Sequence, residues 1–261
     1  MLKHERIRLM EELVAKKGFV SMEELCQTFS ISMNTVRSDV RDLVQKGSAQ
    51  KTYGGISCVQ VAQYSSYEMR ELENVSKKEA IARAAAQMVH NGDIIYVDVG
   101  TTCIPLMRYI PEDYHITLIT NNLSAITQAA SNPNIHIMTF GGTYQPKSNS
   151  FKCTFPALHS YLNSLNISCA FLSVTGISSS GALTNSENFG REVRSGLLAR
   201  CPKCYLLADS SKFGKTALLT YGTLADVSAC FTDSDIPASY QKLCKDMGTR
   251  VVIVDTHQQA E

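Results

Sequence analysis

Apolar and polar positions alternate along the first sixty residues with the spacing of short amphipathic helices. Apolar side chains recur at helical intervals over about residues 3–17 and again over residues 31–44, so each stretch can bury one stripe. Gly18 stands where a helix would end, and Ser21-Met-Glu-Glu24 has the form of a capping box that opens a second helix. Ser32 is placed to cap a third helix. The pattern therefore predicts three short consecutive helices.

The third predicted helix has two faces of different composition. One face is apolar, whereas the other carries amide, hydroxyl and guanidinium groups, which reach base edges and phosphates in a DNA groove. Lys46-Gly47 ends this helix, and Lys51 and Tyr53 lead into Gly54-Gly55, where the backbone of a wing tip can approach phosphate. This order of parts predicts a winged helix-turn-helix domain over residues 1–58. The candidate DNA-binding residues are Ser32, Met33, Asn34, Thr35, Arg37, Ser38 and Arg41 in the helix, and Lys51, Tyr53 and Gly54 in the wing.

Short apolar runs alternate with helical stretches beyond a polar, weakly periodic linker over residues 59–74. Strands are expected at Ile94–Asp98, Ile116–Thr120, Ile135–Phe140, Cys169–Val174, Cys204–Ala208, Val227–Phe231 and Val251–Val254. A helix is expected to open at a capping box, Ser76-Lys-Lys-Glu79, and others to cover about residues 102–110, 122–131, 154–164, 187–200 and 237–247. This alternation predicts an α/β fold, with a larger, doubly wound and mostly parallel domain over residues 75–261.

Polar residues gather where these predicted strands end, which is where parallel sheets bind ligands. Gly100-Thr101-Thr102 follows the first strand: glycine admits a ligand to the backbone, a helix N-terminus favours an anion, and two hydroxyls can donate. Thr120-Asn-Asn122, Gly141-Gly142-Thr143 and Asp209-Ser-Ser-Lys212 follow other strands. Each segment taken alone fits an ordinary helix cap or turn. Four of them at one sheet edge favour a composite polar pocket that suits a phosphate.

Charge and composition limit the possible classes of protein, but they do not distinguish a DNA-binding protein from other soluble proteins. Residues 1–60 carry nine Lys and Arg against seven Asp and Glu, so a small helical domain with a solvated charged face is the alternative to a DNA reader. A net charge of +1 over 261 residues argues against non-specific polyanion binding along the whole surface. We find no apolar run of 18 residues and no signal peptide, so a cytoplasmic protein without a membrane partner is expected.

Nine cysteines are scattered along the chain, and their odd number favours reduced thiols over a disulfide scaffold. Cys201-Pro-Lys-Cys204 has the spacing of a redox or metal pair, but no second pair completes a zinc site. Because Cys204 begins the apolar run Tyr205–Ala208, a structural role is the favoured interpretation. No metal and no cofactor is expected.

Several segments together resemble the DeoR-type bacterial transcription regulators over nearly the whole chain. They are Val20–Leu25, Ile31–Val40, Tyr53–Gly55, Asp98–Thr102, Thr120–Asn122, Gly141–Gly142, Ala170–Ile177, Gly181–Thr184 and Ala208–Gly214. The resemblance implies a sensor domain related to ribose 5-phosphate isomerase that binds a phosphorylated sugar or similar intermediate, with the phosphate at Gly100–Thr102. The candidate effector-binding residues are Asp98, Gly100, Thr101, Thr102, Asn121, Gly141, Gly142, Thr175, Asp209 and Lys212.

Catalysis is not expected from this sequence. In the related isomerases the segment that matches Val174–Gly181 holds more than one aspartate, whereas this chain has none there and Thr175 is no base at neutral pH. Glu187 and Asp209 are possible acids, but they form no paired arrangement. We therefore expect a repressor of a carbohydrate-utilisation operon whose affinity for double-stranded operator DNA is controlled by a phosphorylated sugar. The alternatives are an isomerase-like enzyme with a nucleic-acid-binding module, and a constitutive DNA-binding protein with a vestigial pocket.

A single three-helix head reads few base pairs. Two heads on half-sites about one helical turn apart, or a multiple of it, gain effective concentration and specificity. A homodimer or a larger homo-oligomer is therefore expected.

Overall fold

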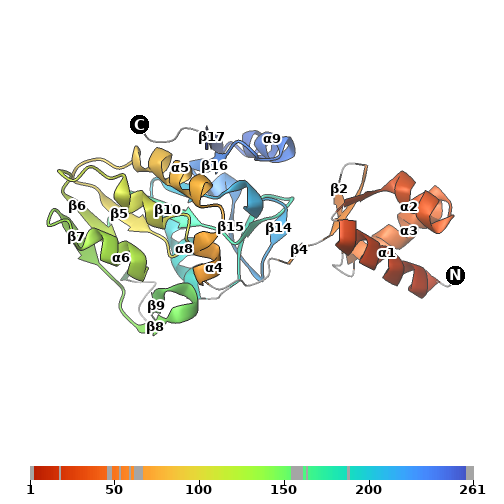
Figure 1. Ribbon diagram of the computed structural model, residues 1–261, viewed down its shortest axis with the longest axis horizontal. Helices are drawn as coiled ribbons and strands as arrows, with labels where there is room; N and C mark the ends of the chain where they lie inside the picture. Colours follow the sequence, from red (N-terminus) through yellow and green to blue (C-terminus); the bar gives the residue numbers. More distant parts are fainter. Residues whose placement is uncertain are drawn as a thin grey trace. The chain divides into compact units, whose positions relative to one another are not determined.

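The computed structural model describes most of the chain, as two compact units that divide after Val61 (Figure 1). The described residues are 3–17, 19–45, 49–52, 54–58, 60–61, 67–153, 161–162, 164–186 and 189–256.

The smaller unit packs three helices against an antiparallel sheet. Its elements are α1 (Lys3–Lys17), β1 (Phe19–Ser21), α2 (Met22–Phe29), α3 (Met33–Gln45), β2 (Ala49–Thr52), β3 (Gly55–Cys58) and β4 (Gln60–Val61). Met10, Leu25 and Val36 bring the apolar stripes of the three helices into one buried core. Each such side chain contributes roughly 1.5–3 kcal/mol when it is fully buried. The predicted winged helix-turn-helix fold is confirmed, and β1 joins the β2–β3 hairpin in the order β1-β3-β2.

Two predicted caps define where the helices of this unit begin. The Ser21 side chain accepts a hydrogen bond from the Glu24 backbone N–H at 3.0 Å, and the Ser32 hydroxyl accepts one from the Thr35 N–H at 3.2 Å. Each bond satisfies a backbone donor that the first turn of a helix leaves free. Ser30 ends α2 in the left-handed region, with φ of 51°.

The larger unit is built on a seven-stranded parallel sheet in the order β17-β16-β13-β10-β5-β6-β7. These strands are β5 (Ile94–Val97), β6 (Ile116–Ile119), β7 (Ile135–Met138), β10 (Cys169–Ser173), β13 (Cys204–Leu207), β16 (Ala229–Asp233) and β17 (Arg250–Val254). All seven fall within one or two residues of the predicted positions, which confirms the predicted doubly wound sheet. From β5, the chain first adds strands on one side and then returns to add β10 on the other. The sheet therefore reverses its direction of growth between β5 and β10, where such sheets bind ligands.

Helices cover both faces of this sheet. On one face α5 (Val75–Ala86), the 3₁₀ helix η1 (Ile104–Arg108) and α6 (Leu123–Ala129) bury side chains such as Phe171. On the other face α8 (Phe189–Arg200) and α9 (Ala238–Asp246) cover the neighbouring Ala170 and Leu172. Burial on both faces explains why the strands are continuous apolar runs. Of the helix predicted over residues 154–164, residues 154–160 and 163 lie outside the described residues.

Several small elements are absent from the sequence prediction. They are α4 (Tyr67–Leu72), β8 (Thr143–Gln145), η2 (Pro146–Ser148), β9 (Ser150–Lys152), β11 (Gly176–Ile177), β12 (Ala182–Asn185), η3 (Ser210–Lys212), β14 (Lys215–Thr216), β15 (Leu219–Thr223) and η4 (Leu224–Asp226). The strands β8 and β9 form a hairpin, and β11, β12 and β15 form an antiparallel sheet.

The predicted capping box at Ser76–Glu79 is wrong. The N-cap of α5 is Asn74, two residues before Ser76; it lies in the left-handed region and makes no side-chain cap hydrogen bond. The Asn74 amide instead donates to Asp209 at 3.1 Å, and Glu79 accepts hydrogen bonds from Arg108 and Tyr109. Tertiary partners thus take the groups that would have closed the box.

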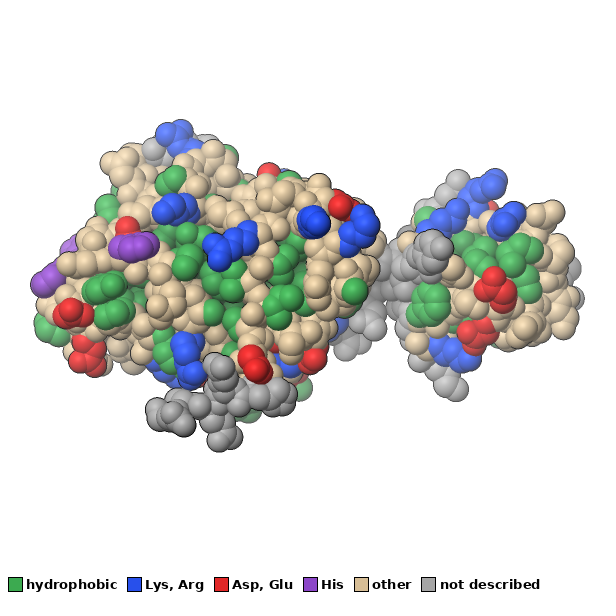
Figure 2. All heavy atoms as spheres, turned by 90° about the horizontal axis from the view of Figure 1, so that it is seen from above, with side chains coloured by type: hydrophobic (Ala, Val, Ile, Leu, Met, Phe, Trp, Pro, Cys, Tyr) green, Lys and Arg blue, Asp and Glu red, His purple; other side chains and the backbone are tan. Residues whose placement is uncertain are grey.

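Among the described helices, none combines the length and hydrophobicity needed to cross a bilayer. Figure 2 shows both acidic and basic side chains on the drawn face of each unit, in keeping with the near-zero net charge.

Candidate functional site

Helix α3 separates a buried face from a polar one, as its sequence predicts. Val36, Val40 and Leu43 are fully buried. The candidate DNA-binding residues of this helix are exposed or half-buried: Ser32, Asn34, Arg37, Ser38 and Arg41 are exposed, and Met33 and Thr35 are half-buried. The exposed side chains can therefore reach a groove without disturbing the core.

The acidic side chains of α3 turn away from its basic face. Asp39, which is fully buried, accepts a hydrogen bond from Arg6 Nε of α1 at 2.6 Å, and Asp42 pairs with Lys3 at 2.7 Å. No ion pair joins Arg37 or Arg41 to another described residue. Two carboxylates that lower the net charge of this unit are thus neutralised by α1, and the guanidinium groups remain available for phosphates or bases.

The wing brings its backbone close to the start of α2. Lys51 and Gly54 are exposed, and Gly54 adopts a φ of 78° that favours glycine. The Gly54 carbonyl accepts a hydrogen bond from the Met22 N–H at 3.0 Å, which ties the wing tip to the helix-turn-helix. Tyr53 lies outside the described residues.

In the larger unit, Asp98 lies at the reversal point of the sheet and is almost fully buried. Its Oδ2 accepts hydrogen bonds from Arg194 Nε at 2.8 Å, Ser173 Oγ at 2.5 Å and the Ser173 N–H at 2.9 Å. Tyr221 donates to the Ser173 carbonyl at 2.9 Å and stacks near the Arg194 guanidinium. Both Asp98 oxygens are occupied by protein donors, the Oδ1 by the Val99 N–H. Asp98 therefore orders the loop above it.

The Gly100-Thr101-Thr102 loop lies directly on this network. A Cβ at Gly100 would come within 2.2 Å of Ser173 Oγ, so only glycine fits there. Thr101 and Thr102 are largely buried, and Thr101 Oγ1 donates to the Arg70 carbonyl at 3.4 Å. This contact brings α4, which the sequence pattern assigned to the linker, to the candidate phosphate loop.

Lys78 shares the Arg70 carbonyl with Thr101, and the charges of Arg70 and Lys212 act on Lys78. Of these three basic residues, Lys78 and Arg70 were not expected from the sequence. Lys78, only 4% exposed, donates to the Arg70 carbonyl. Burial lowers the pKa of Lys78 to about 8, against the attraction of Asp209. Arg70 Nε is buried and has no hydrogen-bond partner among the described residues. Lys212, a predicted site residue, lies 4.0 Å from Asp209 Oδ2.

Asp209 is fully buried and lies close to Lys212 and Lys78. Its Oδ1 accepts hydrogen bonds from the Ser211 N–H and from Asn74, while its Oδ2 has no hydrogen-bond partner among the described residues. Nearby, Lys77 Nζ contacts Asp233 at 2.9 Å, Asp235 at 2.7 Å and Ser210 at 2.8 Å. Lys77 is thus paired with carboxylates, whereas its neighbour Lys78 has no described carboxylate within hydrogen-bonding distance.

The other candidate residues lie at strand ends, but no described contact joins them to this cluster. Asn121 donates to the Phe151 carbonyl and accepts from the Phe140 N–H, both at 2.8 Å. Thr175 donates from both its N–H and its hydroxyl to Asn185 Oδ1. Gly141 and Gly142 have positive φ values, and a Cβ at Gly142 would strike the Lys152 carbonyl. The described hydrogen bonds of Asn121 and Thr175 therefore hold neighbouring segments together at the ends of the strands.

Sequence reasoning missed Arg70, Lys78, Arg194 and Ser173. Arg194 directly follows the buried Val193 of α8, and Lys78 is one of two adjacent lysines in α5. Their spacing alone resembles that of ordinary solvated helix charges. Only the tertiary arrangement distinguishes them.

An exposed basic helix face, together with buried cations at the ligand-binding edge of an α/β sheet, defines a DNA-binding regulator with a sensor for small molecules. The chain belongs to the DeoR family: residues 73–234 match the DeoR C terminal sensor domain and residues 6–61 match the DeoR-like helix-turn-helix domain. It is a transcriptional regulator.

Similar proteins cover nearly the whole chain. The HTH-type transcriptional regulator IolR of Bacillus subtilis is 34% identical over 242 residues, which are 92% of this chain and 95% of that protein. The glycerol-3-phosphate regulon repressor of Escherichia coli is 26% identical, over 90% of this chain and 92% of its own. Among solved structures, ribose 5-phosphate isomerase A of Methanocaldococcus jannaschii aligns at a TM-score of 0.39 and 16% identity, over 54% of this chain and 55% of the isomerase.

Proposed function

We propose that this protein represses a carbohydrate-utilisation operon and that a phosphorylated sugar controls its affinity for the operator. The observation that carries the proposal is the cluster of Lys78, Arg70 and Lys212 around Thr101. One relative is named a glycerol-3-phosphate regulon repressor, which supports repression and a phosphorylated ligand; another is named the L-fucose operon activator of Haemophilus influenzae, which supports only the control of a carbohydrate operon.

The cluster is arranged for a small anion. A buried ammonium group without a hydrogen-bonded carboxylate is costly, and burial lowers the pKa of Lys78 even though Asp209 attracts its charge. A phosphate at Gly100–Thr102 would accept from Lys78, from the Arg70 guanidinium and from the threonine hydroxyls. It would supply the missing negative charge and accept several charge-assisted hydrogen bonds at once. Asn121, Gly141, Gly142 and Thr175 would then line the sugar side of the pocket, and Asp98 and Asp209 would hold the loops.

The same cluster offers a route from ligand to DNA. Arg70 and Lys78 lie in α4 and α5, the first helices after the DNA-binding unit, and Lys78 now donates to the Arg70 carbonyl. If Lys78 donates to a bound phosphate instead of the Arg70 carbonyl, α4 loses this contact with α5. A ligand alters DNA affinity only through a difference in its affinity for the two arrangements, and a coupling of about 1–3 kcal/mol corresponds to roughly 5- to 150-fold.

We further propose residues 1–58 as the DNA-reading domain, 59–74 as the connector and 75–261 as the sensor of a cytoplasmic homo-oligomer. In each protomer Arg37, Arg41 and Asn34 would read the major groove, while Lys51, Tyr53 and Gly54 would meet the adjacent backbone. Paired heads would require half-sites spaced by about one helical turn or a multiple of it.

A thermal-shift screen tests this function. Phosphorylated sugars would be compared with the same sugars without phosphate, and a true effector at 100 times its Kd stabilises the protein by about 2.7 kcal/mol. The effector is then tested for release of a duplex selected from random DNA by the full-length protein. Thr101→Val should remove the ligand response and leave DNA binding intact. Turnover of a sugar phosphate, or a panel without any stabilising phosphate ester, would contradict the proposal.

A further inference from the structure

The Cys201-Pro-Lys-Cys204 segment connects the end of α8 to the start of β13, far along the chain from the proposed effector loop. Of the eight cysteines whose side chains are described, all are free thiols, and only Cys26 and Cys201 are half-buried. Cys204 is 2% exposed. The pair therefore combines one half-buried cysteine with one buried cysteine three residues away.

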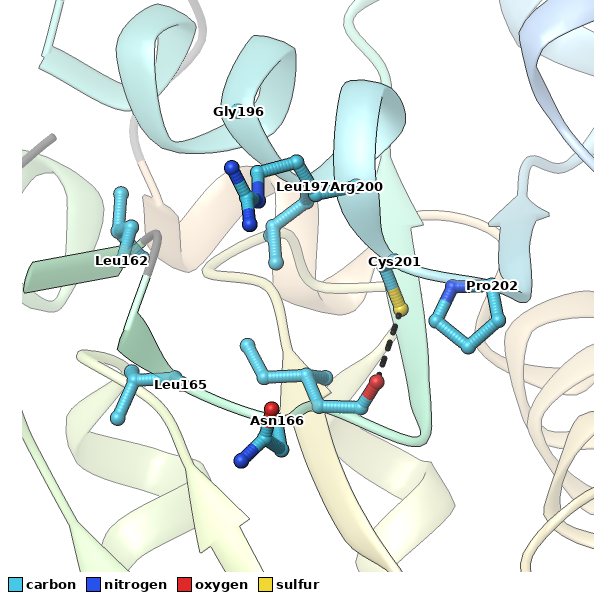
Figure 3. Close-up of a pocket in the computed structure, with 9 residues that line it drawn as sticks. Leu162, Leu165, Asn166, Gly196, Leu197, Arg200, Cys201 and Pro202 are labelled. Atoms are coloured by element: carbon cyan, nitrogen blue, oxygen red, sulfur yellow. Dashed lines mark hydrogen bonds between the residues drawn. The ribbon is translucent and has the colours of Figure 1, made fainter. Parts of the chain in front are cut away.

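The accessible sulfur lies on the wall of a pocket. Cys201 points from the end of α8 toward the facing segment, where its thiol donates to the Ile167 carbonyl at 3.6 Å (Figure 3). The pocket has a volume of about 300 Å³ and is lined by Leu162, Leu165, Asn166, Ile167, Gly196, Leu197, Arg200, Cys201 and Pro202. Its size is at the lower end of the range for small-molecule sites, so a compact molecule can reach the sulfur.

The two thiols differ in acidity because they interact. The interaction with Cys204 lowers the pKa of Cys201, while the interaction with Cys201 and burial raise the pKa of Cys204, whose thiol donates to the Leu197 carbonyl at 3.5 Å. A thiolate is the reactive form of cysteine. The more acidic sulfur is thus the one that the pocket exposes, and the protonated sulfur is held beside it.

A metal site does not explain the pair. Cys169, on the neighbouring strand β10, is a third buried cysteine close by. Even so, no group of three Cys, His, Asp or Glu side chains among the described residues is arranged to hold a metal ion. Disulfide formation needs only two sulfurs. Because Cys201 is half-buried and Cys204 is buried, Cys201 is suited to attack an oxidant and Cys204 to resolve the product.

We propose that Cys201 is a peroxide-reactive thiol and that Cys204 resolves its oxidised form to a disulfide. The Cys201 thiolate attacks the distal oxygen of a hydroperoxide ROOH, the O–O bond breaks, and the alkoxide leaves as ROH after taking a proton from solvent. The sulfur of Cys204 then attacks the sulfenic acid; its thiol proton and the departing hydroxyl leave as water, and a Cys201–Cys204 disulfide forms.

The experiment treats the reduced full-length protein with hydrogen peroxide or cumene hydroperoxide, alkylates the remaining thiols and maps the products by mass spectrometry. The wild type should lose two alkylatable thiols and yield the Cys201–Cys204 disulfide. Cys204→Ser should stop at a sulfenic acid on Cys201 that dimedone traps. Cys201→Ser should leave Cys204 reduced, and Cys201 should react about tenfold faster than Cys26, or more.

Cys26→Ser is the matched control, because Cys26 is the other half-buried cysteine, and it should not change the disulfide yield. Circular dichroism checks that each variant is folded, and the disulfide map of the wild type decides the matter if a variant is not. Oxidation that starts at Cys26, or a Cys201 sulfenic acid that persists in the wild type, would overturn the proposal. Neither result bears on operator binding or on the sugar-phosphate screen.

Discussion

The two units of this protein hold their basic side chains in opposite ways. In α3 the acidic Asp39 and Asp42 pair with α1, and the basic Arg37 and Arg41 are left exposed. At the strand ends of the larger unit, Lys78 is buried and Arg70 Nε has no hydrogen-bond partner among the described residues. The first arrangement keeps cations in water, where an unpaired charge costs little. The second arrangement buries a cation inside the protein, where a charge without a partner raises the free energy of the folded state strongly.

This difference corresponds to the size of the expected partner. A DNA backbone is large and remains outside the protein, so an exposed basic face suffices and its strength depends on salt. A metabolite can enter the fold, and a buried cation then gains the full strength of a poorly screened interaction. The following predictions test this contrast, from the largest expected effect to the smallest.

Arg194→Met should cost about 3–5 kcal/mol of unfolding free energy, because it leaves the Asp98 carboxylate buried without its cation. Urea unfolding of the isolated variant measures this loss. Arg108→Met is the matched control, since Arg108 pairs with Glu79 but is largely exposed; a surface pair is worth about 0–1 kcal/mol. Equal losses of unfolding free energy in the two variants would mean that the buried Asp98–Arg194 pair stabilises the protein no more than a surface ion pair does.

Lys78→Met should weaken effector binding by about 1.5–3 kcal/mol, the value of hydrogen bonds to a charged group. It should not destabilise the free protein, since an apolar chain replaces a cation without a described carboxylate partner. Lys77→Met, one residue earlier, removes a lysine that contacts Asp233 and Asp235, and it should lower stability. Calorimetry for binding and urea titration for unfolding separate the two variants, and a destabilised Lys78→Met would refute the idea of an uncompensated charge.

Arg37→Ala should weaken binding to the selected duplex by about 1–3 kcal/mol if the guanidinium makes a bidentate base contact. Arg8→Ala is the control, because Arg8 is exposed on α1 and pairs with Glu12. Fluorescence anisotropy at fixed salt measures both affinities. If Arg37→Ala binds the duplex with unchanged affinity, Arg37 does not contact the DNA.

Effector affinity should fall as pH rises above about 8. An anion binds the charged form of Lys78, so it raises the pKa of this lysine, which is about 8 in the free protein. Affinity is therefore fully present below the free pKa and decreases, by up to about tenfold per pH unit, until the pKa of the complex is reached. Calorimetry between pH 7 and 10 gives the slope, and Lys78→Met should show none of it.

The sequence predicted the architecture well because its signals were local. Each strand of the main sheet is a continuous apolar run, and Ser21 and Ser32 cap helices within three residues of themselves. The antiparallel sheet of β11, β12 and β15 was missed because its strands are short, rich in Thr and Gly, and paired across distant segments. Ser76 is not a cap because α5 already begins at Val75, and the Glu79 carboxylate accepts hydrogen bonds from Arg108 and Tyr109 instead.

The candidate site was predictable in its loops but not in its charges. Gly100-Thr101-Thr102 was recognisable because a strand, a glycine and two hydroxyls follow one another. Lys78, Arg70 and Arg194 come from helices whose packing brings them to that loop only in the folded chain. Asp98 was expected beside the ligand, yet its described partners are Arg194, Ser173 and Val99.

The buried ammonium of Lys78 also has a consequence for the lifetime of the protein in the cell. Under the proposed function, an anion bound at the sensor would offset the charge of Lys78. Any ligand that binds only the folded protein lowers the unfolded fraction about a hundredfold when its concentration reaches 100 times its Kd. Proteases act on that fraction. A regulator of this design would be degraded faster during starvation for its sugar, and its abundance would follow the metabolite supply.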